Sequence, residues 1–275
     1  MDAWRRRCIE KAELGSIFLY HIRMSAKLSV SIIGFNEERF LEKCLESVKW
    51  ADEIIYVDCG SSDGSIAAAE RHNAKVFRRQ NDFNINVNKQ FGIDRCSGDW
   101  ILYLDPDETV QPHLKEELSA LINSQTPFSA FYIPRKNFYF GEWLKHGGKY
   151  PDAQLRLFRR GKGKFPCVNI HEKLEIEGES GRLKNDMWHD VIENTDWMLD
   201  KIKSYSLRKS RQSLRLNRPP RGFLLKGLRR FFSNYFLKAG FLDGKTGFIV
   251  ASLDFFNEMV FWLKYRELKN NDGKN

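Results

Sequence analysis

The chain has 275 residues and a formal net charge of +9, from 45 lysines and arginines against 36 aspartates and glutamates. This length fits one large α/β domain with an appendage, and the positive balance favours an anionic partner: a nucleoside diphosphate, a nucleic acid or an acidic membrane surface. The five cysteines lack the spacing of a zinc or redox site, which excludes a disulfide-stabilised scaffold and predicts free thiols.

Residues 1–26 are expected to form an N-terminal extension that is poorly ordered. The apolar stretch 14–22 within it is too short and too polar for a secretory signal or a membrane-spanning helix. No other segment reaches membrane-spanning length without charges. Met24 directly precedes the first convincing strand, so residues 1–23 are either a weak extension or an upstream start that the working protein lacks.

Short apolar strands alternate with helices from residue 28 to residue 104. We predict strands at 28–34, 53–58, 74–77 and 100–104, and helices at 36–48, after 64 through 71, and at 86–96. One face of the first helix is apolar: Phe40, Leu41, Cys44, Leu45 and Val48. This alternation predicts βαβ units and a parallel sheet, whose ligands bind beyond the carboxyl ends of the strands.

Polar side chains stand at three of these strand ends: Asn36, Asp58 and Asp105. Asp105 and Asp107 are one residue apart, and such a pair can hold Mg²⁺ or Mn²⁺, which in turn binds a diphosphate. Taken alone, the segment is equally well explained as a strand followed by a polar turn, with Pro106 and Glu108 as turn residues. The prediction of a ligand site therefore rests on the presence of a polar residue at all three strand ends, and not on this segment alone.

The pattern changes after residue 128 to short extended runs separated by glycine and proline, which continue to about His189. Beyond Asp196 the chain is helical and basic, with aromatic-rich helices predicted at 222–239 and 245–268 and a turn at 241–244. The sequence thus divides into the extension 1–26, an α/β domain 27–195 and a C-terminal helical region 196–275.

Three segments together resemble the family 2 glycosyltransferases of the GT-A fold, which is Rossmann-like: Ser31–Glu38, Val57–Ser65 and Gly98–Glu108. The likeness continues through Arg156–Arg160 and Val168–Glu172 into the aromatic tail, and it is strongest to the bacterial subfamily that includes the lipopolysaccharide inner-core β-glucosyltransferases. It implies a GT-A catalytic domain at 27–195 with a mostly parallel sheet. The implied activity is an inverting transfer of a hexose, foremost glucose from UDP-glucose, to a lipopolysaccharide core or another envelope glycan.

The resemblance also implies roles for residues that bind the nucleotide sugar: Phe35, Asn36, Glu37, Asp58, Lys89, Asp105 and Arg156. Asp58 is expected to accept a hydrogen bond from the uracil imide, and Asp105 to lie near the ribose. Lys89 either reaches the base or diphosphate or is an ordinary solvated helix residue.

Asp107 resembles the direct ligand of Mg²⁺ or Mn²⁺, and His189 resembles a downstream histidine that completes the metal shell. A histidine beside a tryptophan is otherwise a packed, hydrogen-bonded residue. Glu172 is the candidate base that takes the proton from the acceptor hydroxyl, although Lys173 stands where many relatives carry aspartate. The alternative is that Glu172 is an ordinary surface residue of a strand. Two other carboxylates are then the candidate bases: Asp152 and Glu175.

The glycine pair Gly147–Gly148 stands where the fold places a flexible acceptor-side loop, and a plain turn explains it equally well. Nine basic residues interleave with apolar and aromatic ones from 208 to 236. This pattern fits an amphipathic helix in an anionic membrane interface, and the alternative is packing on the catalytic domain or on a second subunit. No nucleic-acid-binding signature accompanies the charge.

We therefore expect a cytoplasmic enzyme, peripheral on the inner face of the cytoplasmic membrane, that takes a UDP-sugar donor and a saccharide or glycolipid acceptor. A homo-oligomer is compatible with the apolar tail. Two alternatives stand beside this hypothesis. A protein or peptide acceptor would leave the donor half unchanged, and a non-catalytic membrane scaffold would have no physical need for the clustered carboxylates.

Overall fold

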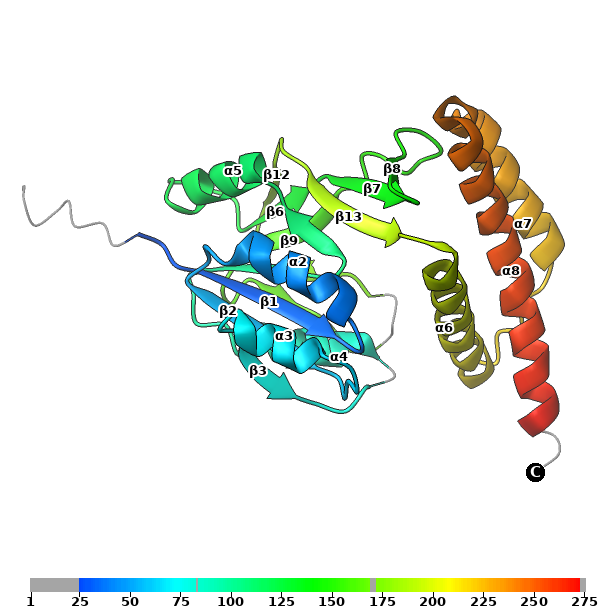
Figure 1. The fold of residues 1–275 in the computed structure, drawn as a ribbon, viewed down its shortest axis with the longest axis horizontal. Helices are drawn as coiled ribbons and strands as arrows, with labels where there is room; N and C mark the ends of the chain where they lie inside the picture. Colours follow the sequence, from blue (N-terminus) through cyan, green and yellow to red (C-terminus); the bar gives the residue numbers. More distant parts are fainter. Residues whose placement is uncertain (1–24, 83, 169–171, 273–275) are drawn as a thin grey trace, which may run out of the picture.

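A seven-stranded sheet with strand order β12-β6-β9-β4-β1-β2-β3 forms the centre of the computed structural model, which describes residues 25–82, 84–168 and 172–272 (Figure 1). Four of its six strand pairings are parallel, and β9 runs antiparallel between β4 and β6. This confirms the predicted α/β fold with a mostly parallel sheet. The strands are β1 (Leu28–Gly34), β2 (Glu53–Asp58), β3 (Lys75–Arg78), β4 (Trp100–Leu104), β6 (Ala130–Ile133), β9 (Gln154–Arg159) and β12 (Ser180–Arg182).

Helices α2 (Glu38–Val48), α3 (Ser65–Arg71), α4 (Ile85–Asp94) and α5 (Pro112–Ile122) cover this sheet. The five residues predicted for the apolar face of α2 are the five that it buries. The helix begins at Glu38 rather than at residue 36, because Asn36 has φ 56° and so cannot continue a right-handed helix. The predicted helix at 86–96 starts one residue earlier, where Asn84 accepts a hydrogen bond from the Asn86 N–H, and ends at Asp94.

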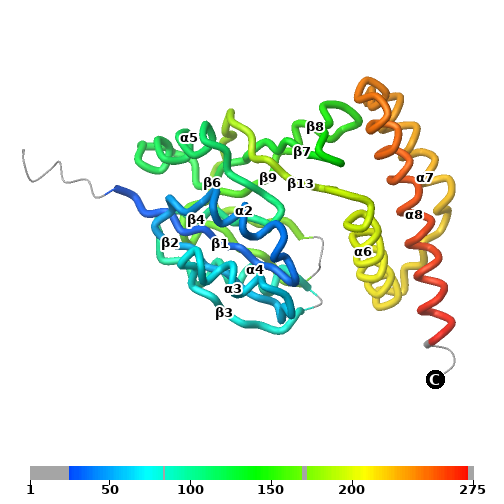
Figure 2. The backbone as a smooth tube through the Cα atoms, viewed as in Figure 1, coloured from blue at the N-terminus to red at the C-terminus, as the bar shows by residue number. Residues whose placement is uncertain are grey.

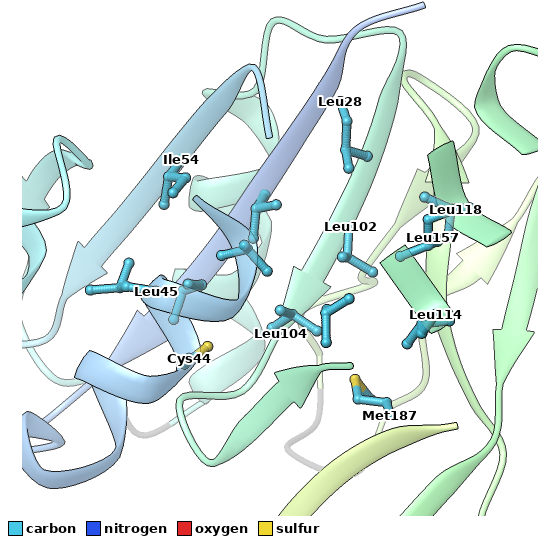
Figure 3. Close-up of a cluster of buried hydrophobic side chains, with 14 of the residues drawn as sticks. Leu28, Cys44, Leu45, Ile54, Leu102, Leu104, Leu114, Leu118, Leu157 and Met187 are labelled. Atoms are coloured by element: carbon cyan, nitrogen blue, oxygen red, sulfur yellow. The ribbon is translucent and has the colours of Figure 1, made fainter. Parts of the chain in front are cut away.

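Apolar clusters lie on both faces of the sheet. Because β1 contributes side chains to both clusters, every one of its residues is buried. The larger cluster joins side chains of β1 and β4 to those of α2 and α5 (Figure 3): Leu28, Leu45, Leu102, Leu114 and Leu118 among them. The second cluster joins Ile33 and Ile101 to Ile93 of α4. Burial of each such side chain stabilises the fold by about 1.5–3 kcal/mol, so the sheet is a rigid support for the loops at its edge.

A second, four-stranded sheet has the order β5-β13-β7-β8. Its central strand β13 pairs antiparallel with β5 and parallel with β7, and it sets His189 opposite Glu108 and Asn137. The chain therefore brings the acidic segment after β4 next to a histidine about 80 residues further on. The strands are β5 (Glu108–Val110), β7 (Arg135–Tyr139), β8 (Glu142–Trp143) and β13 (Met187–Ile192); a separate pair consists of β10 (Gly163–Lys164) and β11 (Glu175–Ile176).

The C-terminal region is helical, as predicted. Helix α6 (Thr195–Arg215) lies between the sheet and an antiparallel pair that we call the C-terminal hairpin (Figure 2): α7 (Phe223–Phe232), which continues as a π-helical turn at Ser233–Leu237, and α8 (Gly244–Asp272). The predicted turn between the two is a 3₁₀ segment, Gly240–Asp243. Glu258 of α8, only 1% exposed, joins the three helices through Lys209 of α6 and Arg230 of α7.

One helix in the described part of the chain, Gly240–Asn271, is long and apolar enough to cross a membrane, and 33% of its most apolar window is buried within the structure. The expectation that no segment reaches membrane-spanning length without charges is not contradicted, because Asp254 and Glu258 interrupt the apolar part of this helix. The four cysteines within the described residues are free thiols, as predicted. Residues 1–24, which make up most of the expected extension, lie outside the described residues.

Candidate active site

The carboxyl ends of β4, β1 and β2 lie side by side, because β1 pairs with both neighbours in parallel. Gly34 is the register partner of Asp58, and Ile32 is the partner of Leu104, the residue before Asp105. Residues that follow these strands therefore meet at one edge. The predicted convergence of the three polar strand ends is confirmed.

Hydrogen bonds join the loops that follow β1 and β2 at this edge. Buried Asp58 accepts hydrogen bonds from the backbone N–H groups of Gly60, at 3.0 Å, and Ser61. Asn36, in the left-handed region that asparagine tolerates, joins the first loop to the second through its Oδ1, which accepts from the Ser62 N–H at 2.8 Å. The ring of Phe35 is 45% exposed, although it follows a fully buried strand. Phe35 directly follows Gly34, the register partner of Asp58, and an exposed ring near a carboxylate suits a nucleobase.

Asp105 is held by two cations. Lys89 Nζ lies 2.9 Å from Oδ1, and the Arg156 guanidinium donates to Oδ2. Burial alone would raise the pKa of Asp105, but Arg156 and Lys89 hold that pKa well below its usual value. The alternative of a solvated Lys89 was wrong, because its side chain is largely buried and lies over the Tyr103 ring.

Glu108 anchors this cluster and was not recognised from the sequence, which favoured a turn residue at this position. Its side chain is 0% exposed, and it accepts from the Arg156 guanidinium, from Arg135 Nη1 at 2.8 Å, and from the Asp105 backbone N–H at 2.9 Å. In the structure Glu108 and Val110 are buried and Thr109 is half-buried, but the residue types Glu-Thr-Val show no apolar alternation that would have indicated this strand. Glu108 thus fixes both the backbone and the arginine that support Asp105.

Asp107 lies between a histidine and a lysine. Its Oδ2 is 3.5 Å from His189 Nε2 and 2.8 Å from Nζ of Lys201, which comes from α6. Burial would raise the pKa of Asp107, but His189 and Lys201 hold that pKa well below its usual value, so the carboxylate is charged. The structure therefore brings together the two residues predicted as metal ligands. Lys201 was not predicted, because 94 residues separate it from Asp107.

Asp107 and His189 fit a divalent cation that also binds a nucleotide. Among the described residues there is no group of three or more histidines, cysteines, aspartates or glutamates that could hold a metal on its own. A carboxylate and an imidazole suit Mn²⁺ or Mg²⁺, and such ions take their remaining ligands from phosphates and water. The Lys201 ammonium against Asp107 shows that positive charge is accommodated at this point.

Glu37 adds an acidic group of a different kind to the same edge. Burial first, and then the charges of Asp107 and Asp105, raise the pKa of Glu37 to about 8, although Lys201 acts in the opposite direction. The carboxyl group is therefore mostly protonated at neutral pH. It can donate a hydrogen bond to an oxygen of a ligand without adding a negative charge beside a diphosphate.

Glu172 lies in the segment between β10 and β11, where both of its carboxylate oxygens accept from the Val168 N–H at 3.0 Å. It is half-buried, whereas Lys173 is exposed. Residues 169–171, including His171 of the resemblance, lie outside the described residues. Of the fallback bases, Asp152 already accepts from Arg135, Asn137 and Gln154, and Glu175 is exposed in β11.

The predicted acceptor-side glycine loop is a turn docked on the C-terminal hairpin. Gly147 and Gly148 both have positive φ, and the Gly147 N–H donates to the Lys238 carbonyl at 2.8 Å. The neighbouring His146 bonds Asp243 through its backbone N–H and its ring. Gly148 has φ 73°, a conformation that other residues rarely adopt, and this favours glycine there.

The sheet topology and the acidic strand ends are those of a nucleotide-sugar transferase of the GT-A fold. Residues 29–173, more than half of the chain, match glycosyl transferase family 2, and the chain belongs to that family. It is 29% identical over 241 residues to the lipopolysaccharide core biosynthesis glycosyltransferase LpsC of Rhizobium meliloti, covering 82% of this chain and 89% of the relative. An uncharacterised glycosyltransferase of Rickettsia bellii is 24% identical over 259 residues, or 89% and 88% of the two chains. These likenesses confirm the predicted family and its lipopolysaccharide-core branch.

Solved structures match more loosely. The glucosyl-3-phosphoglycerate synthase of Mycobacterium tuberculosis, crystallised with Mn²⁺ and UDP-glucose, is 22% identical, with a TM-score of 0.34 over 42% of this chain and 44% of that chain. TarS of S. aureus is 15% identical, with a TM-score of 0.45 over 84% of this chain and 49% of that chain. The chain thus spans less than half the length of either solved structure.

Proposed function

We propose that this protein is a metal-dependent, inverting hexosyltransferase that transfers glucose from UDP-glucose to a lipopolysaccharide core or another envelope glycan. The observation that carries the proposal is Asp107, faced by His189 and Lys201, at the same sheet edge as Asp58 and the exposed ring of Phe35. A carboxylate with a depressed pKa at the same edge as an exposed aromatic ring suits a nucleoside diphosphate and its cation.

In this proposal Phe35 stacks on the uracil, and Asp58 accepts from its imide N–H. Asp107 and His189 would hold Mg²⁺ or Mn²⁺, which supplies positive charge against the departing diphosphate. Lys89 and Arg156, fixed on Asp105, add positive charge at the same edge. Glu37, protonated at neutral pH, donates a hydrogen bond to an oxygen of the donor.

The acceptor hydroxyl oxygen attacks the anomeric carbon from the face opposite the diphosphate. As that bond forms, the bond from the anomeric carbon to the diphosphate oxygen breaks, and UDP leaves with the electron pair. The hydroxyl proton passes to Glu172, the base of this proposal. The structural support for Glu172 is its half-buried position with both oxygens oriented by one backbone N–H.

A glycolipid acceptor is supported by the outer surface of the C-terminal hairpin. Large apolar side chains are exposed along it, with Leu237 at 84% as the extreme, and six aromatic rings adjoin one another at its closed end: Phe231, Phe232, Tyr235, Phe236, Phe241 and Phe248. Residues 218–250 contain seven lysines and arginines and a single acid, Asp243, which is paired with His146. Exposed apolar area flanked by cations suits an anionic bilayer surface.

We place this surface in the membrane interface and not across the membrane. Helix α8 carries Asp254, paired with Lys149 of the catalytic domain at 3.1 Å, and Glu258, paired with Lys209 of α6. A spanning α8 would either break these ion pairs or take them into hydrocarbon, which is costly. The enzyme is then cytoplasmic and peripheral on the inner face of the membrane, with the catalytic domain at 27–195.

The reaction is tested by incubating the purified chain with UDP-, GDP-, ADP- and dTDP-hexoses, with Mn²⁺ or with EDTA. We expect Mn²⁺-dependent release of UDP from UDP-glucose, and loss of the preference for uracil in Asp58→Asn. Release with a purine nucleotide sugar alone, or undiminished release in EDTA, would contradict the proposed donor site. Transfer is then assayed with rough-type lipopolysaccharide and with peptides, and glucosylation of peptides alone would replace the proposed acceptor.

The membrane contact is tested by sedimentation with vesicles of phosphatidylglycerol and of phosphatidylcholine. We expect binding to the anionic vesicles that falls with salt, because the cations act together with the apolar surface. A protein that stays in the supernatant as a dimer by light scattering would assign the apolar surface to a second copy of the chain.

A further inference from the structure

Asn137 is a buried residue of β7, 4% exposed, whose amide is oriented by its neighbours. Its Nδ2 donates to the Lys149 carbonyl at 2.7 Å and to Asp152 Oδ2 at 3.2 Å. A carbonyl and a carboxylate only accept hydrogen bonds, so the NH₂ group must face them. The amide oxygen, Oδ1, therefore faces the third neighbour, His189 Nδ1, at 2.6 Å.

This orientation determines where His189 carries its proton. Since Oδ1 can only accept, Nδ1 of the imidazole must be the donor, and in the neutral ring the lone pair is then on Nε2. Nε2 is the atom that faces Asp107 Oδ2 across 3.5 Å. In the imidazolium, Nε2–H can donate toward that carboxylate, which is how His189 lowers the pKa of Asp107. In the neutral ring, the Nδ1–H tautomer is the form that offers Nε2 as a ligand to a cation.

The sheet and the C-terminal hairpin keep Asn137 in this position. His189 and Asn137 are register partners in the parallel strands β13 and β7, so their side chains project on the same face. Lys149, whose carbonyl orients the amide, is tied to Asp254 of α8 at 3.1 Å, and Asn234 also donates to Asp254 at 2.7 Å. Asp152, the second acceptor, is fixed by Arg135.

We propose that Asn137 is a positioning residue that fixes His189 as the Nδ1–H tautomer and so directs Nε2 to the cation site, with Lys149 and α8 holding Asn137 in place. This inference rests on the proposed function for the identity of the cation, but its statement about the tautomer does not. Residues that bond the outer nitrogen of a metal-binding histidine fix its tautomer and orientation in this way.

A purely structural bond between the strands would predict a different outcome. Loss of such a bond would lower the stability of the sheet while leaving the imidazole tautomer and the metal affinity unchanged. The two readouts below therefore measure the ring of His189 and the bound metal, not activity.

The first readout is the ¹⁵N spectrum of the full, metal-free chain labelled in histidine, with the His189 resonances assigned by their loss in His189→Gln. At a pH where the His189 ring is neutral, we expect the Nδ1–H tautomer in the wild type, a mixture in Asn137→Ala, and the Nδ1–H tautomer again in Asn137→Asp, which keeps an acceptor oxygen. Asn185→Ala, which removes a bond to Glu117 far from the site, should leave the wild-type spectrum.

The second readout is Mn²⁺ affinity in the presence of UDP, followed by electron paramagnetic resonance. We expect binding about 10- to 100-fold weaker in Asn137→Ala and within twofold of wild type in Asn185→Ala. An Nε2–H tautomer in the wild type or in Asn137→Asp would overturn the proposal, as would unchanged tautomer and affinity in Asn137→Ala. A wild-type protein with the Nδ1–H tautomer but without Mn²⁺ affinity would instead refute the metal in the proposed function.

Discussion

The carboxyl edge of the central sheet and the outer surface of the C-terminal hairpin differ in the partners that their side chains have within the chain. At the sheet edge, Asp105 is paired with Lys89 and Arg156, and Asp107 with Lys201 and His189, all from the same chain. On the hairpin, large apolar side chains such as Leu237 lack such cover among the described residues. The difference indicates a small, charged ligand at the first region and an extended apolar partner at the second.

Each region also has one fully buried carboxylate, and the two are held differently. Glu108 is bonded by Arg135 and Arg156, which are themselves largely buried. Glu258 meets Lys209, Lys226 and Arg230, of which the last two are about half exposed. Solvent therefore screens part of the Glu258 cluster, and we infer a more rigid donor site and a hairpin that is held more weakly.

The largest expected effect is a loss of transfer activity caused by a change at the carboxyl edge of the sheet. Asp107→Asn removes the charge that would hold the cation, and we expect transfer from UDP-glucose to fall about 10³-fold, since about 4 kcal/mol of electrostatic stabilisation is lost. Vesicle binding should not change. Asp99→Asn, at the opposite end of β4, is the matched control. Full transfer by Asp107→Asn would eliminate the assigned ligand.

The next largest effect is a loss of vesicle binding caused by a change on the C-terminal hairpin. In Phe236→Ser with Leu237→Ser, two exposed apolar side chains are lost, each worth up to about 1.5–3 kcal/mol in a bilayer. We expect the vesicle partition coefficient to fall about 10²-fold while hydrolysis of UDP-glucose is unchanged. Tyr132→Ser changes an exposed aromatic residue of the catalytic domain and should leave partitioning intact. Equal losses in both variants would argue against the hairpin as the contact surface.

A smaller effect is expected from Glu258→Gln, which leaves three cations without their shared carboxylate. Because two of them are half exposed, we expect a loss of about 2 kcal/mol and not the larger value of a fully buried pair, or about 4–8 °C in Tm. Calorimetry of the full chain measures it. Glu267→Gln, at an exposed pair with Lys264, should shift Tm by less than about 2 °C. Equal Tm values for both variants would show that the cluster does not hold the helices.

The last effect is a pH dependence at the donor edge. The pKa of Glu37 is raised from 4.5 to about 8 in the folded protein, so its contribution to stability is complete below pH about 4.5 and is lost as pH rises toward 8. Glu37→Gln should therefore flatten the fall in the free energy of unfolding between pH 5 and pH 8. Urea titrations in EDTA test this, and parallel curves for the two proteins would contradict the assigned pKa.

Sequence periodicity was sufficient for the local parts of this molecule. It predicted the first four strands, the buried face of α2 and the strand-end positions of Asp58 and Asp105, because these depend on neighbours within a few residues. It did not reveal Glu108 as a buried centre, nor Lys201 and Asn137 beside the predicted ligands. Their partners lie 27 to 94 residues away and are joined by tertiary packing that no local pattern records. The role of Glu172 stays a prediction.

The contact between Lys201 and Asp107 has a consequence for the order in which ligands bind. A divalent ion that enters alone must displace an ammonium that already neutralises the carboxylate, and so gains little. An ion that arrives with a nucleoside diphosphate brings phosphate oxygens to which the released ammonium can turn. Metal and nucleotide should therefore bind with positive cooperativity, each raising the affinity for the other by the same factor.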